Sequence, residues 1–295
     1  MRAFITGGGG FVGRWLTEHL QSHGDEVIST DVDVDITDPL AVRAAVAAAA
    51  PDAVYHLAAV SNVGESWDAP AKTFAVNAVG TLHVLEAVKA LPSPPTVLLV
   101  CSSEVYGRVS PEELPLREDA ALRPLSPYAA SKVAAEFLGL QAFLAHKLPV
   151  IRVRAFNHIG PGQAPAFVVA SLARQIVEAT RAGASSVKVG NLTPQRDFTD
   201  VRDVVRAYRL LVERGTPGEV YNVCSGEAVA IEDLARRMLV LAGADLALEV
   251  DPDRVRAVEM PALCGDPARV IAATGWTREF SLDQTLADVL ASLEA

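Results

Sequence analysis

The 295-residue sequence predicts an α/β fold, in which a doubly wound parallel sheet is joined to a smaller C-terminal α/β lobe. In the first half of the chain, short β-branched apolar runs alternate with segments of helical length and composition, as in parallel sheets with crossover helices. A glycine cluster follows the first apolar run directly. After about residue 155 the alternation loosens. We therefore predict one domain at 1–155 and mainly the lobe at 156–295, with some segments returning to the sheet.

Strands and helices of the first half follow from these patterns. The apolar runs are short and bounded by turn residues, which predicts buried strands. The segments between them are rich in Ala, Leu and Glu, and Pro39 follows Asp38 as at a helix start. The predicted strands are Arg2–Ile5, Glu26–Thr30, Ala53–Leu57, Thr96–Ser102 and Pro149–Arg154, and the predicted helices are Val12–His23, Pro39–Ala50, Ala71–Ala90 and Pro127–His146.

The second half has a less regular pattern, which predicts a smaller lobe beside the sheet. Its first segments are expected to be a loop at Asn157–Pro165, a helix at Phe167–Arg181, a strand at Ser186–Val189 and a polar segment at Pro194–Asp200. They are followed by a helix at Val201–Arg214, a strand at Val220–Val223, a helix at Ile231–Leu241 and a terminal helix at Leu282–Leu293.

Charge and hydropathy exclude several classes of protein. The chain has 26 Lys and Arg against 36 Asp and Glu, a net charge of −10, and no basic run, which argues against a nucleic-acid surface. Apolar runs such as Thr96–Cys101 are far shorter than the ~20 residues of a membrane span. Met1–Ile5 leads straight into the glycine cluster, so we expect no signal peptide. Cys101, Cys224 and Cys264 are widely spaced in apolar surroundings, which predicts buried free thiols, no metal site and a cytoplasmic location.

The glycine cluster is the first candidate binding element. Gly7, Gly10 and Gly13 lie between the first strand and the first helix with GxxGxxG spacing, and Phe11 and Val12 complete the turn. Missing side chains permit a tight turn and the close approach of a pyrophosphate to the helix N-terminus. A purely structural turn is the alternative. The placement between strand and helix favours a Rossmann-type dinucleotide site.

Acidic residues after the second strand bear on the choice of dinucleotide. Asp31 ends that strand, 18 residues after Gly13 (31 − 13), where a carboxylate would bind the ribose hydroxyls of adenosine. It would repel a 2′-phosphate, so NAD(H) is favoured over NADP(H). Asp33 and Asp35 lie close by and could take its place. Arg14 could instead face a 2′-phosphate, so NADP(H) stays possible.

The next candidate residues are catalytic. Tyr128 and Lys132 lie four apart on one face of a predicted helix. We expect the lysine ammonium to lower the pKa of the phenol and so make it a proton donor or acceptor near neutral pH. Ser102 ends a parallel strand, where its hydroxyl could hold the substrate oxygen that Tyr128 protonates.

Together with these residues, further motifs make the chain resemble the extended short-chain dehydrogenases/reductases that act on nucleotide sugars. The motifs are TGGGGFVG, YHLAA, VNAVGT, SSEVYG, YAASK, RAFNHIGPGQ and RDFTDVRDVVRAY. The resemblance implies a catalytic set of Ser102, Tyr128 and Lys132. It also implies that Asp35 and Ile36 contact the adenine of the cofactor. Further implied cofactor residues are those near the end of the strand Ala53–Leu57, namely Leu57, Ala58 and Ala59, together with Asn77.

Within this family the sequence is most similar to the GDP-mannose dehydratase branch, and there to the GDP-6-deoxy-D-lyxo-4-hexulose reductases. Ile159 stands where the 4,6-dehydratases usually carry an acid after the Asn-His pair, which favours 4-keto reduction. A 4,6-dehydratase or a 4-epimerase is the enzymatic alternative. A non-catalytic cofactor sensor is the alternative from another class, because a fold alone does not fix function.

The resemblance also implies substrate contacts and a homodimer. The main expected role of Glu104 is contact with the sugar, and a role as catalytic base is the alternative. Arginine suits a diphosphate because its planar guanidinium can bond two phosphate oxygens at once. The implied substrate residues are Ser103, Glu104, Asn157, Val168, Arg196, Arg254, Arg256 and Glu259. Relatives dimerise through the helices that match Ala71–Ala90 and Pro127–His146, which carry Val76, Leu82, Val88, Phe137, Leu140 and Phe143 beyond one face.

Overall fold

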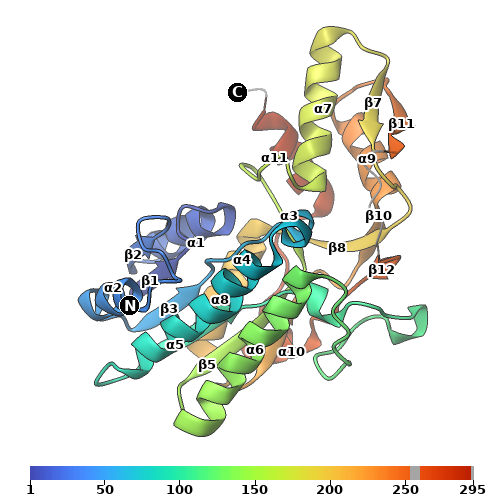
Figure 1. Ribbon diagram of the computed structural model, residues 1–295. Helices are drawn as coiled ribbons and strands as arrows, with labels where there is room; N and C mark the ends of the chain where they lie inside the picture. Colours follow the sequence, from blue (N-terminus) through green and yellow to red (C-terminus); the bar gives the residue numbers. More distant parts are fainter. Residues whose placement is uncertain (253–259, 294–295) are drawn as a thin grey trace.

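A computed structural model describes residues 1–252 and 260–293 (Figure 1). Its centre is a six-stranded sheet in the order β2-β1-β3-β4-β5-β9, and every neighbouring pair is parallel. The carboxyl ends of all six strands therefore meet at one edge, where ligands of such sheets bind. The strands are β1 (Arg2–Thr6), β2 (Glu26–Thr30), β3 (Ala53–His56), β4 (Thr96–Val100), β5 (Val150–Ala155) and β9 (Val220–Val223).

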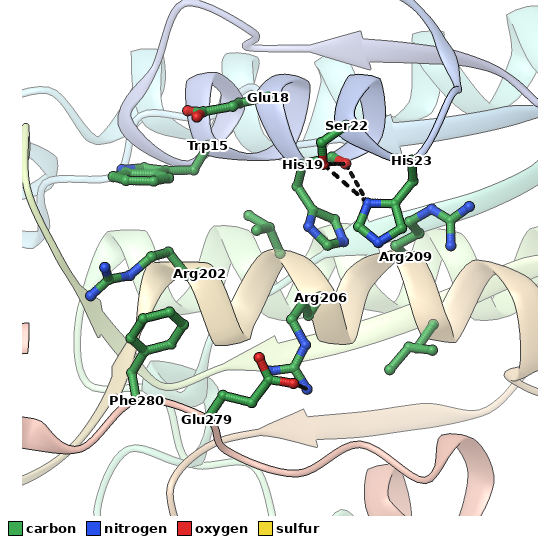
Figure 2. Close-up of a pocket in the computed structure, with 12 residues that line it drawn as sticks. Trp15, Glu18, His19, Ser22, His23, Arg202, Arg206, Arg209, Glu279 and Phe280 are labelled. Atoms are coloured by element: carbon green, nitrogen blue, oxygen red, sulfur yellow. Dashed lines mark hydrogen bonds and ion pairs between the residues drawn. The ribbon is translucent and has the colours of Figure 1, made fainter.

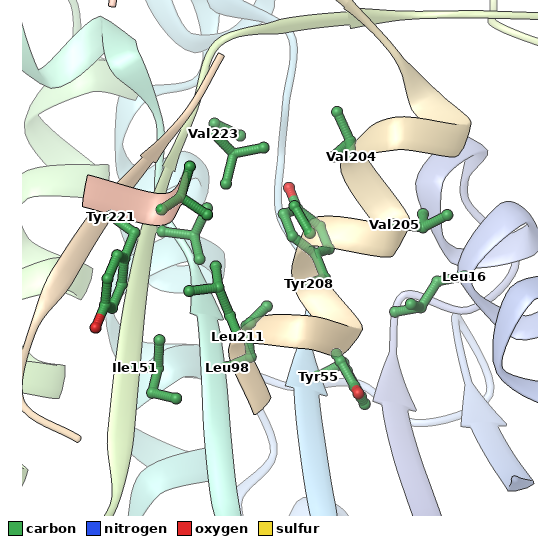
Figure 3. Close-up of a cluster of buried hydrophobic side chains, with 14 of the residues drawn as sticks. Leu16, Tyr55, Leu98, Ile151, Val204, Val205, Tyr208, Leu211, Tyr221 and Val223 are labelled. Carbon is green, nitrogen blue, oxygen red and sulfur yellow. The ribbon is translucent and has the colours of Figure 1, made fainter. Parts of the chain in front are cut away.

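Helices cover both faces of this sheet, because successive side chains of a strand point to opposite faces. On one face, Tyr55, Leu98 and Ile151 pack beneath Tyr208 and Leu211 (Figure 3). On the other, the alternate strand residues pack against a second set of helices. The first face is covered by α1 (Phe11–Ser22), α8 (Val201–Arg214) and α10 (Ala268–Thr274), and the second by α2 (Pro39–Ala49), α5 (Gly80–Lys89) and α6 (Pro127–His146). Shorter turns are α3 (Val63–Asp68), α4 (Pro70–Phe74), the π-helical η1 (Ala75–Val79) and the 3-10 turns η2 (Ser103–Tyr106) and η3 (Pro111–Glu113).

The lobe has a small core of its own between α7, α9 and α11 (Figure 1). Its central strand, β8, pairs with β6, β10 and β12, and a separate parallel pair joins β7 to β11. The strands are β6 (Asn157–Ile159), β7 (Ser186–Val189), β8 (Gln195–Asp200), β10 (Ala228–Ala230), β11 (Ala247–Val250) and β12 (Ala262–Leu263), and the helices are α7 (Val168–Ala182), α9 (Ile231–Leu241) and α11 (Leu282–Ala291).

The predicted parallel sheet is confirmed, but two segments of the second half differ from the prediction. Asn157–Pro165 contains β6 in place of a continuous loop, and the polar segment Pro194–Asp200 contains β8. Apolar alternation does not reveal β8, because three of its buried residues are the polar Asp197, Thr199 and Asp200. The predicted helix Ala71–Ala90 is divided into α4, η1 and α5.

Three segments after residue 155 belong to the central sheet and its cover. β9 extends the sheet beside β5, and α8 packs on α1. α10 packs on α8 and β9. The chain therefore passes from the sheet to the lobe and back more than once.

The cysteines are buried and unpaired, as predicted. Within residues 1–252 and 260–293, no three His, Cys, Asp or Glu side chains gather closely enough to hold a metal ion. No helix in the same part of the chain has both the length and the hydrophobicity to cross a bilayer.

Candidate active site

The glycine turn lies at the carboxyl ends of β1 and β3. Gly7 has a φ of +76°, and a Cβ there would lie 2.8 Å from the backbone N of Ala58, so both the backbone angle and the space require glycine. A Cβ on Gly13 would collide with the carbonyl oxygen of Gly7. Because α1 begins at Phe11 with no side-chain cap on its free N–H groups, this cradle fits the pyrophosphate of a dinucleotide.

A chain of hydrogen bonds fixes the neighbouring strand ends. The amide of Ala58 donates to Thr6 Oγ1 at 3.3 Å, and Thr6 Oγ1 lies 2.7 Å from Nδ1 of His56. On its other side, Nε2 of His56 lies 2.9 Å from Oγ1 of Thr81, which donates to the carbonyl of Asn77 at 2.7 Å. Thr81 therefore accepts from Nε2–H, and His56 accepts from Thr6. Burial lowers the pKa of His56 to about 3, so it is a packed neutral histidine.

Acidic side chains gather where β2 ends. Asp31 is exposed, and its carboxylate stands over Gly9 so closely that a Cβ on that glycine would collide with it. The carboxylate of Asp33 accepts from the backbone N of Asp31 at 2.6 Å. Asp35 accepts from the backbone and hydroxyl of Thr37, and these bonds lower its pKa. Asp31 is thus placed beside the glycine turn, where the sequence predicts the adenosine ribose.

Other predicted cofactor residues have clear structural roles. Ile36 is buried against Gly80, and its carbonyl accepts from His83 at 3.0 Å. Asn77 is 1% exposed, and its amide bonds the backbone of Val60 and the hydroxyl of Ser131. Asn77 thus holds the loop after β3 against α6. The lining residues Leu57, Ala58 and Ala59 are partly buried at the end of β3.

Ser102 and Tyr128, which are 26 positions apart (128 − 102), are brought together, so that the Ser102 hydroxyl acts on the pKa of the Tyr128 phenol. Ser102 caps the η2 turn by accepting from the backbone N of Glu104 at 3.2 Å, and Tyr128 lies in the first turn of α6, which is capped by Ser126. Both side chains are more than nine-tenths buried. Burial raises the pKa of Tyr128 to about 12, and the hydrogen bond with Ser102 opposes that rise.

The part of Lys132 differs from the sequence expectation. Its ammonium does not lower the pKa of Tyr128 but donates to the carbonyl oxygen of Val100 at 2.9 Å. Burial lowers the pKa of Lys132 itself. The i, i+4 spacing places both residues on one face of α6, but the long lysine side chain reaches the carboxyl end of β4 instead.

Two residues of the η2 turn complete this group. Ser103 is buried, whereas Glu104 is half-exposed and close enough for its charge to raise the pKa of Tyr128. The catalytic candidates therefore all lie at the carboxyl ends of β4 and at the start of α6.

The other expected substrate residues of the described chain lie on β6, on β8 and at the start of α7. Nδ2 of Asn157 and Oε1 of Gln163 are buried without a hydrogen-bond partner in the structure. Asn157 pairs with Phe198 in β8, two positions after Arg196. Val168 is exposed at the first position of α7.

Arg196 lies beside a buried carboxylate that the sequence analysis missed. Its guanidinium donates to the carbonyl oxygens of Gln195 and Met260 at 2.9 and 2.8 Å. The next residue, Asp197, is fully buried and accepts from Ser225 and from two glycine amides at 2.7–3.2 Å. Asp197 thus ties β8 to the segments after β9 and β12. The other predicted substrate residues, Arg254, Arg256 and Glu259, lie outside the described residues.

A cavity of about 490 Å³ lies away from these residues, between α1 and α8 (Figure 2). Its arginines already hold carboxylates: Arg202 pairs with Asp200 and Asp288, and Arg206 with Asp203 and Glu279. None of the predicted catalytic residues lines this cavity. We therefore assign the chemistry to the strand ends.

Sequence reasoning also missed a buried ion pair between Glu136 and Arg154 behind the Ser102 turn. The signal was present, because the predicted buried strand Pro149–Arg154 contains both Arg152 and Arg154. A buried cation requires a buried carboxylate nearby. The pattern does not identify which acid supplies it.

Comparisons with known proteins agree with this geometry. A family model described as GDP-mannose 4,6 dehydratase matches residues 29–289. The GDP-6-deoxy-D-mannose reductase of Pseudomonas aeruginosa is 38% identical, with 100% of this chain and 97% of the relative covered. GDP-mannose 4,6 dehydratase 2 of Caenorhabditis elegans is 26% identical over 88% of this chain and 72% of the relative.

Solved structures show the same fold. RMD from Pseudomonas aeruginosa complexed with NADPH has a TM-score of 0.91 and 37% identity, covering 100% of this chain and 99% of the other. The UDP-glucose 4-epimerase of Thermus thermophilus in complex with NAD has a TM-score of 0.90 and 28% identity, with the same coverage. These findings confirm the predicted resemblance: the chain belongs to the GDP-mannose 4,6 dehydratase family, among the extended short-chain dehydrogenase/reductase enzymes that act on nucleotide sugars.

Proposed function

We propose that the protein reduces the 4-keto group of a nucleotide-linked 6-deoxy-hexulose of the GDP-4-keto-6-deoxymannose type, using NADH or NADPH. A bound nicotinamide supplies the hydride to C4. The phenol of Tyr128 donates its proton to the C4 oxygen, and the hydroxyl of Ser102 holds that oxygen by a hydrogen bond. The ammonium of Lys132 has three donors, one of which bonds Val100. The others can hold the nicotinamide ribose.

The observation that carries this proposal is the buried contact between Ser102 and Tyr128 at the carboxyl end of β4. A buried phenol with a raised pKa stays protonated at neutral pH, as a proton donor to a ketone requires. The 38% identity to a GDP-6-deoxy-D-mannose reductase supports the choice of substrate.

The test is a spectrophotometric assay with purified protein and GDP-4-keto-6-deoxymannose. We expect one reduced nicotinamide to be consumed for each sugar reduced, because a reductase does not recycle its cofactor. GDP-mannose serves as the comparison substrate. Conversion of GDP-mannose to a 4-keto sugar without net loss of reduced cofactor would overturn the proposal in favour of a 4,6-dehydratase.

A 4,6-dehydratase is the second candidate function, and Glu104 is the observation in its favour. Its carboxylate lies two residues after Ser102, where a base next to the 4-keto group is needed. A reductase uses Glu104 only to contact a sugar hydroxyl. Glu104→Gln therefore separates the two functions: it abolishes dehydration but leaves most of the reduction.

For the cofactor we propose a preference for NADH over NADPH. The carboxylate of Asp31 beside Gly9, with Asp33 behind it, is unfavourable for a 2′-phosphate. The structurally similar RMD was solved in complex with NADPH, so the proposed preference for NADH would distinguish this protein from RMD. We expect kcat/KM to be higher with NADH, and Asp31→Asn to narrow that difference. A higher kcat/KM with NADPH in the wild type would refute the preference.

We further propose that Ser103, Glu104, Asn157, Val168 and Arg196 contact the nucleotide sugar. The buried amide nitrogen of Asn157, which has no hydrogen-bond partner in the structure, is the strongest support. The proposed role of Arg254, Arg256 and Glu259 rests on the family resemblance alone.

We propose a homodimer in the cytoplasm. Apolar side chains on adjacent helices are exposed, with Trp67 at 53%, Leu82 at 37% and Phe137 at 51%. Val88, which the sequence analysis assigned to this face, is fully buried in the core instead. Light scattering at micromolar concentration should give twice the chain mass, and Phe137→Glu should halve it. Three buried free thiols are consistent with a reducing compartment.

A further inference from the structure

The carboxylate of Glu136, on α6, is fully buried behind the proposed catalytic residues. Arg154, on β5, forms a two-pronged ion pair with it: Nε lies 2.9 Å from Oε2, and Nη2 lies 2.7 Å from Oε1. Arg152, on the same strand, approaches the same carboxylate through a single longer contact of 3.4 Å. Arg154 is thus the main cation of this pair.

The third guanidinium nitrogen of Arg154, Nη1, contacts the η2 turn. Nη1 donates to the hydroxyl of Tyr106 at 3.0 Å and to the carbonyl of Glu118 at 2.9 Å. The guanidinium carbon lies 4.9 Å from the centroid of the Tyr106 ring. The hydroxyl of Tyr106 in turn donates to Asn222 at 2.7 Å. Tyr106 is fully buried, so the orientation of its ring is set by these contacts.

These contacts join the two segments that carry the catalytic groups. Glu136 lies about one helical turn beyond Lys132 and two beyond Tyr128 on α6. Tyr106 ends the η2 turn that Ser102 caps. We infer that Arg154 is a positioning residue, which holds the turn of Ser102 against α6 so that the Ser102 hydroxyl meets the phenol of Tyr128. This inference rests on the proposed function, because that function gives the Ser102–Tyr128 contact its catalytic meaning.

The chemistry of the position requires arginine. A rigid fork of five N–H donors can grip a carboxylate with two of them and still donate to a phenol and a carbonyl. A lysine ammonium is a point charge with three donors and cannot hold the same planar arrangement. Burying an ion pair also costs desolvation, and apolar replacements are often as stable. Stability alone therefore gives little reason for the pair at this place.

The test combines a crystal structure with kinetics for the variant Arg154→Lys, which keeps the buried charge. We expect the hydrogen bond between Ser102 and Tyr128 to be lost. With GDP-4-keto-6-deoxymannose and NADH or NADPH, kcat should fall about 10- to 100-fold, while the KM for the dinucleotide changes less than about threefold. Tyr106→Phe is the second variant, because it keeps the ion pair and removes only the phenol oxygen. It should lower kcat in the same sense by a smaller factor.

Arg152→Lys is the matched control, because Arg152 shares Glu136 but contacts Gly218 in place of the η2 turn. It should keep kcat within about threefold of the wild type. An intact Ser102–Tyr128 hydrogen bond with unchanged kcat in Arg154→Lys and Tyr106→Phe would overturn the inference. An equal loss of kcat in Arg152→Lys would overturn it as well. If the hydrogen bond is lost but kcat is unchanged, the positioning stands and the proposed catalytic set fails.

Discussion

The cofactor side and the substrate side of the active site are held together in different ways. On the cofactor side, the glycine turn and the ends of β1 and β3 are neighbours in the parallel sheet, and backbone contacts between Gly7 and Ala58 bring them together. On the substrate side, β8 is held by the carboxylate of Asp197, whose partners Ser225 and Gly265 come from distant segments. The cofactor side therefore depends on glycines, which have no side chain, and the substrate side depends on a buried carboxylate.

This difference predicts different responses to substitution. On the cofactor side, close backbone packing leaves no room for added atoms, so larger side chains should destabilise the fold through steric strain. On the substrate side, the costly substitution is one that removes the charge of the buried carboxylate, because its several hydrogen-bond donors would then lose their acceptor. Between the two sides lie the catalytic groups, whose removal should leave both sides folded.

The largest effect is expected from Tyr128→Phe. Loss of the proton donor should lower kcat about 10²- to 10⁴-fold, while the Kd for the dinucleotide changes little. Stopped-flow turnover and a fluorescence titration of the cofactor measure the two quantities. Tyr55→Phe is the control, because the Tyr55 hydroxyl is buried without a partner on β3. Near-normal turnover of the Tyr128 variant would remove this residue from the mechanism.

The next effect is expected on the cofactor side, from Gly7→Ala compared with Gly24→Ala. The two glycines have φ values of +76° and +77°, but a Cβ meets the backbone of Ala58 at Gly7 and nothing within 4 Å at Gly24. Gly24→Ala should cost about 1 kcal/mol and Gly7→Ala about 3 kcal/mol in urea unfolding. Only Gly7→Ala should also weaken dinucleotide binding. Equal losses at both positions would show that strain, not packing, governs the turn.

On the substrate side, Asp197→Asn should weaken substrate binding. Its amide would direct N–H groups at the backbone donors of Gly226 and Gly265, which should cost about 2 kcal/mol of stability. Because β8 carries Arg196, the KM for the nucleotide sugar should rise about tenfold, with kcat less affected. Asp200→Asn is the control: this buried carboxylate ends β8 and bonds Arg202 and Thr285. A similar KM change in both variants would contradict a specific role of Asp197.

The smallest effect is a pH dependence of the cofactor side. Burial first, and then the charges of His23, Arg209 and Arg206, lower the pKa of His19 on α1 to about 4. The unfolded chain binds the proton first, so stability is kept above pH 6.5 and lost as the pH falls towards 4. Because this side chain is half-exposed, we expect a loss of only about 1 kcal/mol.

His19→Gln should remove that part of the acid sensitivity. Urea unfolding at about pH 7 and about pH 5 measures it, and His146→Gln, at the exposed end of α6, is the control. A wild type and a His19→Gln variant with the same pH dependence would exclude the proposed proton linkage.

Local patterns in the sequence predicted the parts of the site that depend on neighbouring residues. The glycine spacing predicted the turn at Gly7–Gly13, and the YxxxK spacing placed Tyr128 and Lys132 on one helix face. Where a side chain depends on distant segments, the sequence did not predict its contacts. The contact of Lys132 with Val100 spans 32 positions, and that of Asp197 with Ser225 spans 28. Neither periodicity nor composition records such pairs.

The strand β8 shows the same limit for the fold. Its buried polar residues make it look like a loop in the sequence, because a hydrophobic pattern records burial of carbon and not of hydrogen-bonded oxygen. Donors from distant segments make the burial of the two carboxylates possible: Ser225 and Gly265 bond Asp197, and Thr285 bonds Asp200. Conversely, the helical length and composition of 71–90 concealed the π-helical turn around Asn77.

The position of β9 bears on the order in which the chain can fold during synthesis. The cofactor half comes first in the sequence, but its sheet needs β9 beside β5, and its α1 face needs α8. Val270 and Trp276 then close the same core. A nascent chain that has reached residue 155 therefore carries an open sheet edge and an uncovered apolar face, both of which favour aggregation. The half of the protein that the ribosome makes first is completed only when residues near 276 have emerged.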